Sequence, residues 1–282
     1  MKFIGSKDIK EHVERYLKEQ KEKFYNKLVI DVPAGSGHST QILKNIGARV
    51  EAYDLFPDFF NVDGLDCKEA DLSKEIPVQN NYADYVLCQE GIEHMSDQLH
   101  TLRELNRILK KDGILLITTP SYSQLRSRFS YLFSESEYAY KIMPPNEIDS
   151  IWISNNNEKN DIYFGHIFFI GIQKLRVLAR IAGFKIKKIH HLRVNHTSLL
   201  LLLLFYPFIF LINYFAYKRA MNRRQDVDKK VKKKVYGEIF KLSIDPRILV
   251  DGHLFLELEK EFEADETNQI LHSKFTDFNM VT

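Results

Sequence analysis

Two carboxylates and two glycines surround the first two predicted strands in an arrangement that can hold a nucleotide-like ligand. The short apolar run Leu28–Val32 contains Asp31 and leads to Gly35 and Gly37. Glycine is needed where a backbone turns sharply and approaches a ligand without a Cβ in the way. Asp54 lies seventeen positions after Gly37, at the end of the next predicted strand, where a carboxylate can accept both hydroxyls of a ribose. The pattern predicts an adenosine-containing ligand.

Two positions help to identify this ligand. Nicotinamide enzymes share the glycines and the acid after the second strand, so these residues alone do not separate the two cofactor classes. The dinucleotide fingerprint requires Gly or Ala at position 40, where this chain has Thr40. The acid Asp31 suits a cofactor that carries a methionine ammonium and no pyrophosphate. The residues favour S-adenosylmethionine, and a nicotinamide-dependent dehydrogenase is the rival enzyme.

Strands and helices alternate along the chain, which predicts an α/β fold with a doubly wound, mostly parallel sheet. An amphipathic helix is expected over Asp8–Lys23, and another over Leu99–Lys110, with Asp97 as its cap and Gly113 at its end. The expected strands are Leu28–Val32, Val50–Asp54, Ala83–Cys88, Ile114–Thr118, Phe184–Leu192 and His253–Glu259. Ligands of such sheets bind at the carboxyl ends of the strands.

The composition limits the classes of protein. A chain of 282 residues with 44% hydrophobic residues can bury one sizeable core. The net charge of +2 is too balanced for a nucleic-acid binder, so we expect no nucleic-acid partner. Cys67 and Cys88 form no metal-binding pattern, and the N-terminus has no apolar leader. We expect a cytoplasmic protein.

The sequence resembles class I S-adenosylmethionine-dependent methyltransferases over roughly residues 25–190 and a last strand near 253–259. The family pattern D-x-G-x-G-x-G corresponds to Asp31, Pro33, Gly35 and Gly37. Pro33 departs from the pattern and removes one N–H, but it keeps the carbonyl that the family directs at the methionine end. The resemblance implies a Rossmann-like, seven-stranded sheet with a helical lid and an apolar helical insertion before the last strand.

The resemblance also implies the remaining cofactor contacts. Asp54 corresponds to the ribose-binding acid, and Asp71 to the aspartate that meets the adenine amino group. Gln89–His94 and Thr118–Pro120 look like the motifs of the ubiquinone-pathway O-methyltransferases and related small-molecule enzymes. The residues expected to bind S-adenosylmethionine are Asp31, Ala34, Gly35, Gly37, Asp54, Leu55, Asp71, Leu72 and Gln89.

Methylation of a hydroxyl group requires a base, and His94 is the first candidate because an imidazole titrates near neutrality. His166 is the second candidate catalytic residue, and Glu93, next to His94, is the third. Glu90, Glu93 and His94 are spaced i, i+3, i+4, so one helical turn would present a divalent-cation triad, and the resemblance makes Mg²⁺ conceivable. The alternative is that Glu93 and His94 only brace the following helix.

A lid over the acceptor is expected at about residues 121–165. Arg126 and Arg128 could hold an anionic group of the acceptor. The aromatic side chains of this segment could hold a ring, a sugar or an acyl chain, or form the lid's own core. They are Tyr122, Phe129, Tyr131, Phe133, Tyr138, Tyr140, Trp152 and Tyr163. The expected acceptor is small and amphipathic or lipid-linked, such as a quinone precursor, a lipid or a glycan intermediate.

Leu199–Ala216 contains no charged residue and has the length at which a transmembrane helix becomes a candidate. A single crossing conflicts with the fold, because the strands on either side of it pair with each other. Pro207 is expected to split the run into Leu199–Tyr206 and Phe208–Tyr217, each too short to span. Lys229–Lys234 follow, so we expect Leu199–Tyr217 to contact the inner face of the plasma membrane peripherally. A buried cap and a homodimer interface are the alternatives.

The expected organisation follows from these assignments. Residues 1–193 and 248–261 form the methyltransferase domain, residues 194–247 the apolar and basic helical insertion, and residues 262–282 a flexible polar tail. The rival from another class is a non-catalytic protein that binds S-adenosylmethionine or serves as a membrane scaffold with the same fold.

Overall fold

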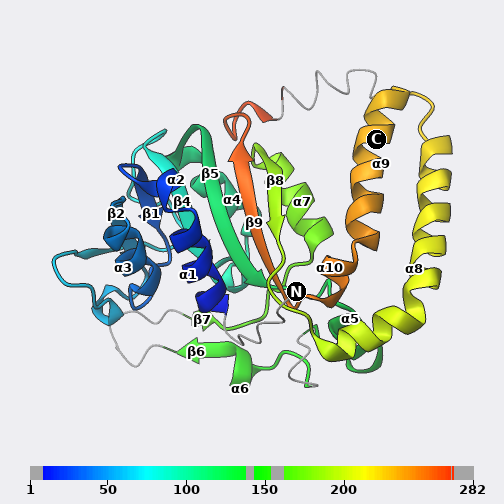
Figure 1. Ribbon diagram of the computed structural model, residues 1–282, viewed down its shortest axis with the longest axis horizontal. Coiled ribbons are helices and arrows are strands. Elements are labelled where there is room, and N and C mark those ends of the chain that lie inside the picture. Colours follow the sequence, from blue (N-terminus) through cyan, green and yellow to red (C-terminus); the bar gives the residue numbers. More distant parts are fainter. Residues whose placement is uncertain (1–8, 138–142, 154–161, 268, 270–282) are drawn as a thin grey trace.

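The computed structural model describes residues 9–137, 143–153, 162–267 and 269, and its centre is a seven-stranded sheet (Figure 1). The strand order is β3-β2-β1-β4-β5-β9-β8. Strands β1 to β5 pair in parallel, and β9 lies antiparallel between β5 and β8. The strands are β1 (Leu28–Asp31), β2 (Arg49–Asp54), β3 (Cys67–Glu69), β4 (Ala83–Gln89), β5 (Leu109–Pro120), β8 (Phe184–His190) and β9 (His253–Lys260). The predicted class I fold is confirmed.

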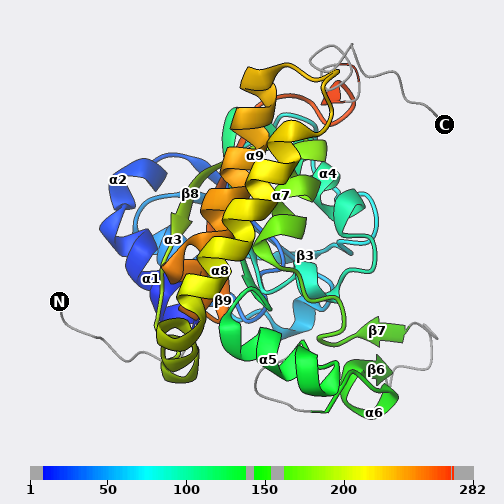
Figure 2. The same cartoon turned by 90° about the vertical axis from the view of Figure 1, so that its right-hand side faces the viewer.

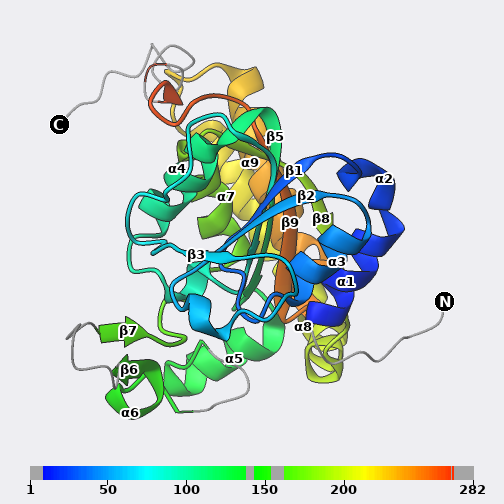
Figure 3. The ribbon, with the colours of Figure 1, turned by 90° about the vertical axis from the view of Figure 1, so that its left-hand side faces the viewer.

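Helices cover both faces of the sheet (Figure 3). One layer contains α1 (Ile9–Glu19), α2 (Lys21–Phe24) and α3 (His38–Asn45), and the other contains α4 (Gln98–Ile108) and α7 (Ile172–Ile181). Successive strand residues point to opposite faces. Val29 and Leu116 therefore join the core under α1 and α3, while Ile30 and Leu115 join the core under α4 and α7.

Two predicted details differ in the structure. The leading helix breaks into α1 and α2 at Gln20. Helix α4 begins with Asp97 as its cap, as predicted, but ends at Ile108 rather than near Gly113. The buried Lys260 of β9 donates to the Asn106 and Leu109 carbonyls at 2.9 and 2.8 Å. A lysine from the last strand therefore satisfies this helix end without a glycine.

The predicted lid lies at the carboxyl ends of the parallel strands (Figure 3). It contains α5 (Leu125–Ser134), α6 (Glu147–Ser150) and an antiparallel hairpin of β6 (Ile151–Ile153) and β7 (Ile162–Phe164). Tyr138, Tyr140, the side chain of Trp152 and most of the predicted tail 262–282 lie outside the described residues.

The segment between β8 and β9 forms a helical hairpin beside α7 (Figure 2). It consists of α8 (His196–Asn222) and α9 (Lys229–Ile244), and the short α10 (Pro246–Val250) leads to β9. The predicted split at Pro207 is wrong, because α8 is one helix of 27 residues with Pro207 inside it. The helix bends along its length (Figure 1), which is the ordinary effect of an internal proline.

Candidate active site

A cavity of about 560 Å³ opens at the carboxyl ends of β1, β2 and β4. This volume is typical of a site for a small molecule or cofactor. Seven of the nine predicted cofactor residues line it: Ala34, Gly35, Asp54, Leu55, Asp71, Leu72 and Gln89. Asp31 and Gly37 do not reach the cavity wall, and they shape the loop beneath it instead.

Asp31 holds the glycine loop from below. Its side chain is 1% exposed, and it accepts a hydrogen bond of 2.6 Å from the Thr40 hydroxyl at the start of α3. Burial, opposed by the Thr40 hydrogen bond and reinforced by the Asp54 charge, raises the pKa of Asp31 to about 7. Thr40, which argued against a dinucleotide site, therefore joins β1 to α3.

Gly37 lets the loop turn into α3. Its φ is +86°, and an added Cβ would lie 2.3 Å from Val62 Cγ2. Gly91 has a similar role on the opposite wall, since a Cβ there would lie 2.8 Å from the Pro33 ring. The two loops therefore approach each other as closely as a missing side chain permits.

Two carboxylates are positioned on the β2 and β3 side of the cavity. The Asp54 carboxylate accepts the backbone N–H groups of Gly35 and Phe56 at 2.7 and 2.8 Å. Asp71 accepts from the Ser73 N–H and hydroxyl, at 2.9 and 2.7 Å, and lies 3.1 Å from Lys74 Nζ. These hydrogen bonds fix both carboxylates at the cavity wall, where hydroxyl and amino groups of a ligand could donate to them.

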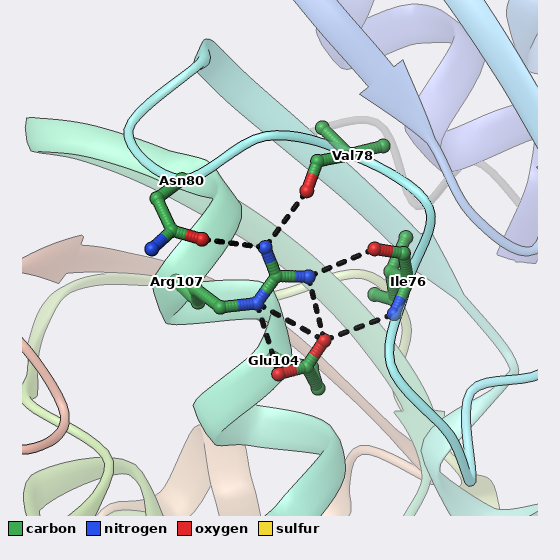
Figure 4. Close-up of polar contacts among 5 residues, drawn as sticks. All are labelled: Ile76, Val78, Asn80, Glu104 and Arg107. Carbon is green, nitrogen blue, oxygen red and sulfur yellow. Dashed lines mark hydrogen bonds and ion pairs between the residues drawn. The ribbon is translucent and has the colours of Figure 1, made fainter.

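Arg107 of α4 anchors the chain that follows Asp71 (Figure 4). It donates to the Ile76 and Val78 carbonyls at 2.8 and 2.7 Å, and to Asn80 Oδ1 at 2.7 Å. It also forms a forked ion pair with Glu104, which in turn accepts the Ile76 N–H. The loop that carries the Asp71 wall is thereby fixed to a core helix.

Glu90 and Glu93 separate instead of sharing one helical turn, which corrects the predicted metal triad of Glu90, Glu93 and His94. Glu90 has a left-handed φ of +48°, and it accepts from the Thr118 hydroxyl at 2.9 Å. Glu93 is fully buried and accepts from the Thr119 hydroxyl at 3.0 Å. The donor atoms that do lie together, within 4.8 Å of one another, belong to Glu93, His94 and His166.

The environment of Glu93 is unusual for a glutamate. Burial, reinforced by the Glu90 charge, holds the pKa of Glu93 well above the usual range. Among the described residues, its Oε1 atom is buried without a hydrogen-bond partner. A carboxyl whose ionisation is disfavoured by burial therefore lies beside the two histidines.

His94 lies in the cavity wall, and a lid carbonyl orients its ring. Its Nδ1 lies 2.7 Å from the Phe164 carbonyl on β7. A carbonyl only accepts, so Nδ1 carries the proton and Nε2 is the accepting nitrogen of the neutral ring. The His166 ring lies 5.0 Å from the His94 ring, so the structure brings the two predicted bases together.

A second cavity of about 200 Å³ adjoins this group, and Glu90 belongs to the walls of both cavities. Its lining includes Ser121, Gln124 and Ser127 from the lid, together with His166 and His253. His253 Nε2 lies 3.4 Å from the Glu90 carboxylate. His253 is not among the site residues predicted from the sequence, and its place directly after Gly252 at the start of the last strand was the available signal.

A family described as "Methyltransferase domain" matches residues 5–189. The chain belongs to this methyltransferase family. A solved SAM-dependent methyltransferase from Archaeoglobus fulgidus superposes with a TM-score of 0.50 at 16% identity, and the match covers 92% of this chain and 96% of that one. At this identity the likeness shows the fold alone.

Curated relatives of this methyltransferase are similar over a shorter range. A ubiquinone biosynthesis O-methyltransferase of Xanthomonas campestris pv. campestris (strain B100) is 28% identical over 125 residues, which are 41% of this chain and 52% of that protein. The protein of the same name from Actinobacillus pleuropneumoniae serotype 7 (strain AP76) is 25% identical over 142 residues, or 46% and 60%. The chain therefore spans about half the length of these relatives.

Proposed function

We propose that this protein transfers a methyl group from S-adenosylmethionine to a hydroxyl group of a small amphipathic or lipid-linked acceptor. The observation that carries the proposal is the position of His94, which lines the cofactor-sized cavity and has its Nδ1 on the Phe164 carbonyl. The names of the relatives, ubiquinone biosynthesis O-methyltransferases, support a hydroxyl as the acceptor group.

The residues of the first cavity fit the cofactor. Asp54 and Asp71 provide one carboxylate for a ribose and one for an adenine amino group, and Leu55 and Leu72 give the cavity apolar surface. When bound, S-adenosylmethionine supplies a methyl group on a positively charged sulfur. The protein then has to position an oxygen nucleophile and remove its proton.

His94 can remove that proton without a change of tautomer. Its Nδ1–H stays on the Phe164 carbonyl, so Nε2 can take the proton of an acceptor hydroxyl. Because Phe164 belongs to β7, the lid orients the base as well as covering it. The acceptor hydroxyl would therefore lie in the first cavity beside His94, and the second cavity, which shares Glu90 with the first, would hold the rest of the acceptor.

The substitution His94→Gln tests this role. We expect turnover to fall about 10²-fold or more, while calorimetry shows unchanged affinity for S-adenosylhomocysteine. Suitable probes are methylcatechol and pentadecylcatechol, since the proposed acceptor is amphipathic and the longer chain should be the better substrate. Equal losses of activity and thermal stability would instead make His94 a structural brace. His166→Gln is the matched variant, because it removes the neighbouring candidate base and leaves His94 in place.

Cofactor binding has a separate test. Asp54→Ala should weaken S-adenosylhomocysteine binding at least about tenfold, or ~1.4 kcal/mol. A preference for NAD would support the dehydrogenase alternative. Binding of S-adenosylhomocysteine with no methylation of either catechol would support the non-catalytic alternative.

A divalent cation is the second candidate feature of the site. Glu93, whose Oε1 has no hydrogen-bond partner in the described part of the chain, and the two histidines supply one oxygen and two nitrogens within 4.8 Å. Imidazole donors suit Zn²⁺ or Mn²⁺ better than the Mg²⁺ expected from the sequence. A chelator that abolishes activity, with activity returning when Zn²⁺ or Mn²⁺ is added, would establish the ion. In Glu93→Gln, added metal should not restore activity. Activity unaffected by chelator would mean that Glu93 and the two histidines hold no ion needed for the reaction.

A further inference from the structure

Helix α8 exposes an unusually large apolar surface. None of the residues in its most apolar 18-residue window is buried, and the mean hydropathy of that window is 2.3. Soluble monomers rarely expose contiguous apolar patches larger than a few hundred Å². We call the exposed apolar residues the outer face of α8: Leu199, Leu200, Leu203, Leu204, Phe205, Phe208, Phe210, Leu211, Ile212, Tyr214 and Phe215.

The rest of the protein covers only a narrow stripe of α8. The half-buried residues Leu202, Tyr206, Ile209 and Asn213 recur at helical spacing. Two aromatic rings of α8 contact α9. The ring centroid of Phe240 on α9 lies 5.8 Å from that of Phe210 and 5.6 Å from that of Tyr217. One side of α8 therefore packs against α9, with Phe210 at the margin of this contact, and most of the outer face is exposed within the described chain.

Length and composition alone would allow α8 to cross a membrane, because 27 residues make about 40 Å of helix. The fold excludes a single crossing. Asn195 N–H donates to the Val250 carbonyl at 2.9 Å, and Leu192 N–H donates to Asp251 at 2.8 Å, so both ends of the insertion are fixed at one place. A crossing by α8 would require a return crossing by α9.

Helix α9 cannot make that return. Its 16 residues give about 24 Å of helix, less than the roughly 30 Å of a bilayer core. Helix α9 also carries five lysines in its first turns and Lys241 in its last turn. Placing each of these charges at the membrane centre would cost free energy. Helix α8 can therefore rest on a bilayer surface but not span it.

The charges around the hairpin favour an anionic lipid surface over a second copy of the chain. The segment between His196 and Ile244 contains ten lysines and arginines but only three acidic residues. Lys218 and Arg219 are exposed at the end of α8. The exposed lysines of α9 are Lys229, Lys230, Lys233 and Lys234. A second hairpin would bring more cations to this surface, whereas anionic headgroups would neutralise them.

Lys232 departs from the sequence interpretation of this basic cluster. It is 8% exposed, and its ammonium donates to the Met221, Arg223 and Arg224 carbonyls at 3.1, 3.2 and 3.1 Å. It therefore caps α8 and holds the turn of the hairpin, and it is not available to headgroups.

The apolar surface continues onto the lid. Phe129 of α5 lies 5.2 Å from Phe205 of α8, and the Arg126 N–H donates to the Ser198 hydroxyl at 3.1 Å. On the same helix, Leu132 and Phe133 are 71% and 80% exposed. Helix α5 itself contributes Ser127 to the lining of the second cavity, so the surface joins α8 to the rim of that cavity.

We propose that the outer face of α8, with the exposed end of α5, docks on the surface of a bilayer that contains anionic lipids. The apolar side chains enter the boundary between headgroups and acyl chains, and the exposed lysines beside them contact the headgroups. Neither helix crosses the bilayer. This inference does not depend on the proposed methyl transfer.

Flotation of the full chain with vesicles tests the docking. Vesicles of equal parts phosphatidylglycerol and phosphatidylcholine should carry the protein with them, and phosphatidylcholine alone should carry much less. Leu203→Ser/Phe208→Ser/Phe215→Ser should abolish binding, since these side chains are 72%, 62% and 65% exposed. Ile148→Ser/Val177→Ser, on α6 and α7, is the control and should still bind.

A charge-matched pair of variants separates local attraction from net charge. Changing Lys229, Lys230, Lys233 and Lys234 to Gln should lower the partition constant at least about tenfold. The same change at Lys18, Lys21, Lys23 and Lys27, four exposed lysines near α1 and α2 on the other side of the molecule, should have little effect. Unchanged S-adenosylhomocysteine binding by all variants would show that they fold.

Labelling decides between docking and spanning. In a Cys67→Ser parent, the single variants His196→Cys and Asn222→Cys should both react with a membrane-impermeant maleimide when the protein binds vesicles from outside. Protection of position 222 alone would mean that α8 spans. Failure of the unaltered chain to bind anionic vesicles, or a dimer that the three-serine variant converts to a monomer without vesicle binding, would overturn the proposal.

Discussion

Asp31→Asn should change how the stability of the protein depends on pH, because burial raises the pKa of Asp31 from 3.8 to about 7. Between about pH 4 and pH 7, the Asp31 carboxyl is protonated in the folded state and ionised in the unfolded state. The free energy of unfolding therefore falls as pH rises through this window, and the full destabilisation by Asp31 is present above pH 7. At about 1.4 kcal/mol per pH unit, the cost reaches about 4 kcal/mol.

Asparagine has nearly the shape of the protonated acid and still accepts the Thr40 hydroxyl, but it cannot ionise. Urea unfolding of both proteins, without cofactor, should show the variant gaining stability relative to the unaltered chain as pH rises. The difference should increase by about 4 kcal/mol between about pH 4 and pH 7 and stay constant above it.

The control for this prediction is Asp71→Asn. Burial raises the pKa of Asp71, but the hydrogen bonds from Ser73 and the charge of Lys74 outweigh burial, so the pKa is lowered. The stability that Asp71 contributes is therefore present above its unfolded value and is lost only in acid. Its difference curve should be flat where that of Asp31 rises. A flat curve for Asp31→Asn as well would show that Asp31 is ionised in the folded protein, and the account of the loop would be wrong.

Three further substitutions test how the site and the hairpin are held. Gly37→Ala should lower the free energy of unfolding by about 2 kcal/mol or more, measured with urea. The left-handed φ and the close contact with Val62 both destabilise an alanine here. Gly35→Ala, with nothing within 4 Å, should cost less. Arg107→Lys should cost about 2–4 kcal/mol by the same assay, since a lysine cannot reproduce the forked contacts. Lys232→Met should speed hydrogen exchange at the end of α8, whereas Lys233→Met should not, since only Lys232 caps the helix.

The sequence was sufficient to predict the cofactor cavity because its walls follow the ends of parallel strands. Asp54 and Gln89 end strands with clear apolar patterns, and parallel strands bring such positions to one edge. Strand β3 could not be predicted in the same way. Its residues Cys67–Glu69 are half-buried or exposed, so they carry no apolar alternation.

The arrangement around His94 depends on features without a local sequence pattern. The left-handed backbone at Glu90 turns its carboxylate toward Thr118, while Glu93 reaches Thr119. Neither direction follows from the spacing of the acids. The lid carbonyl of Phe164 approaches His94 from seventy residues away, and only the folded chain reveals that contact. Pro207 failed as a predictor because a proline bends an exposed helix without ending it here.

The position of β9 in the sheet affects how the protein can be synthesised. Strand β9 lies between β5 and β8, yet it is the last strand to be made. During translation, β8 has no partner in the sheet until about residue 260 has left the ribosome, and α8 emerges some thirty residues before β9 begins. The nascent chain therefore exposes its most apolar helix before the domain can close, so a lipid surface or a chaperone could bind α8 before the enzyme has folded.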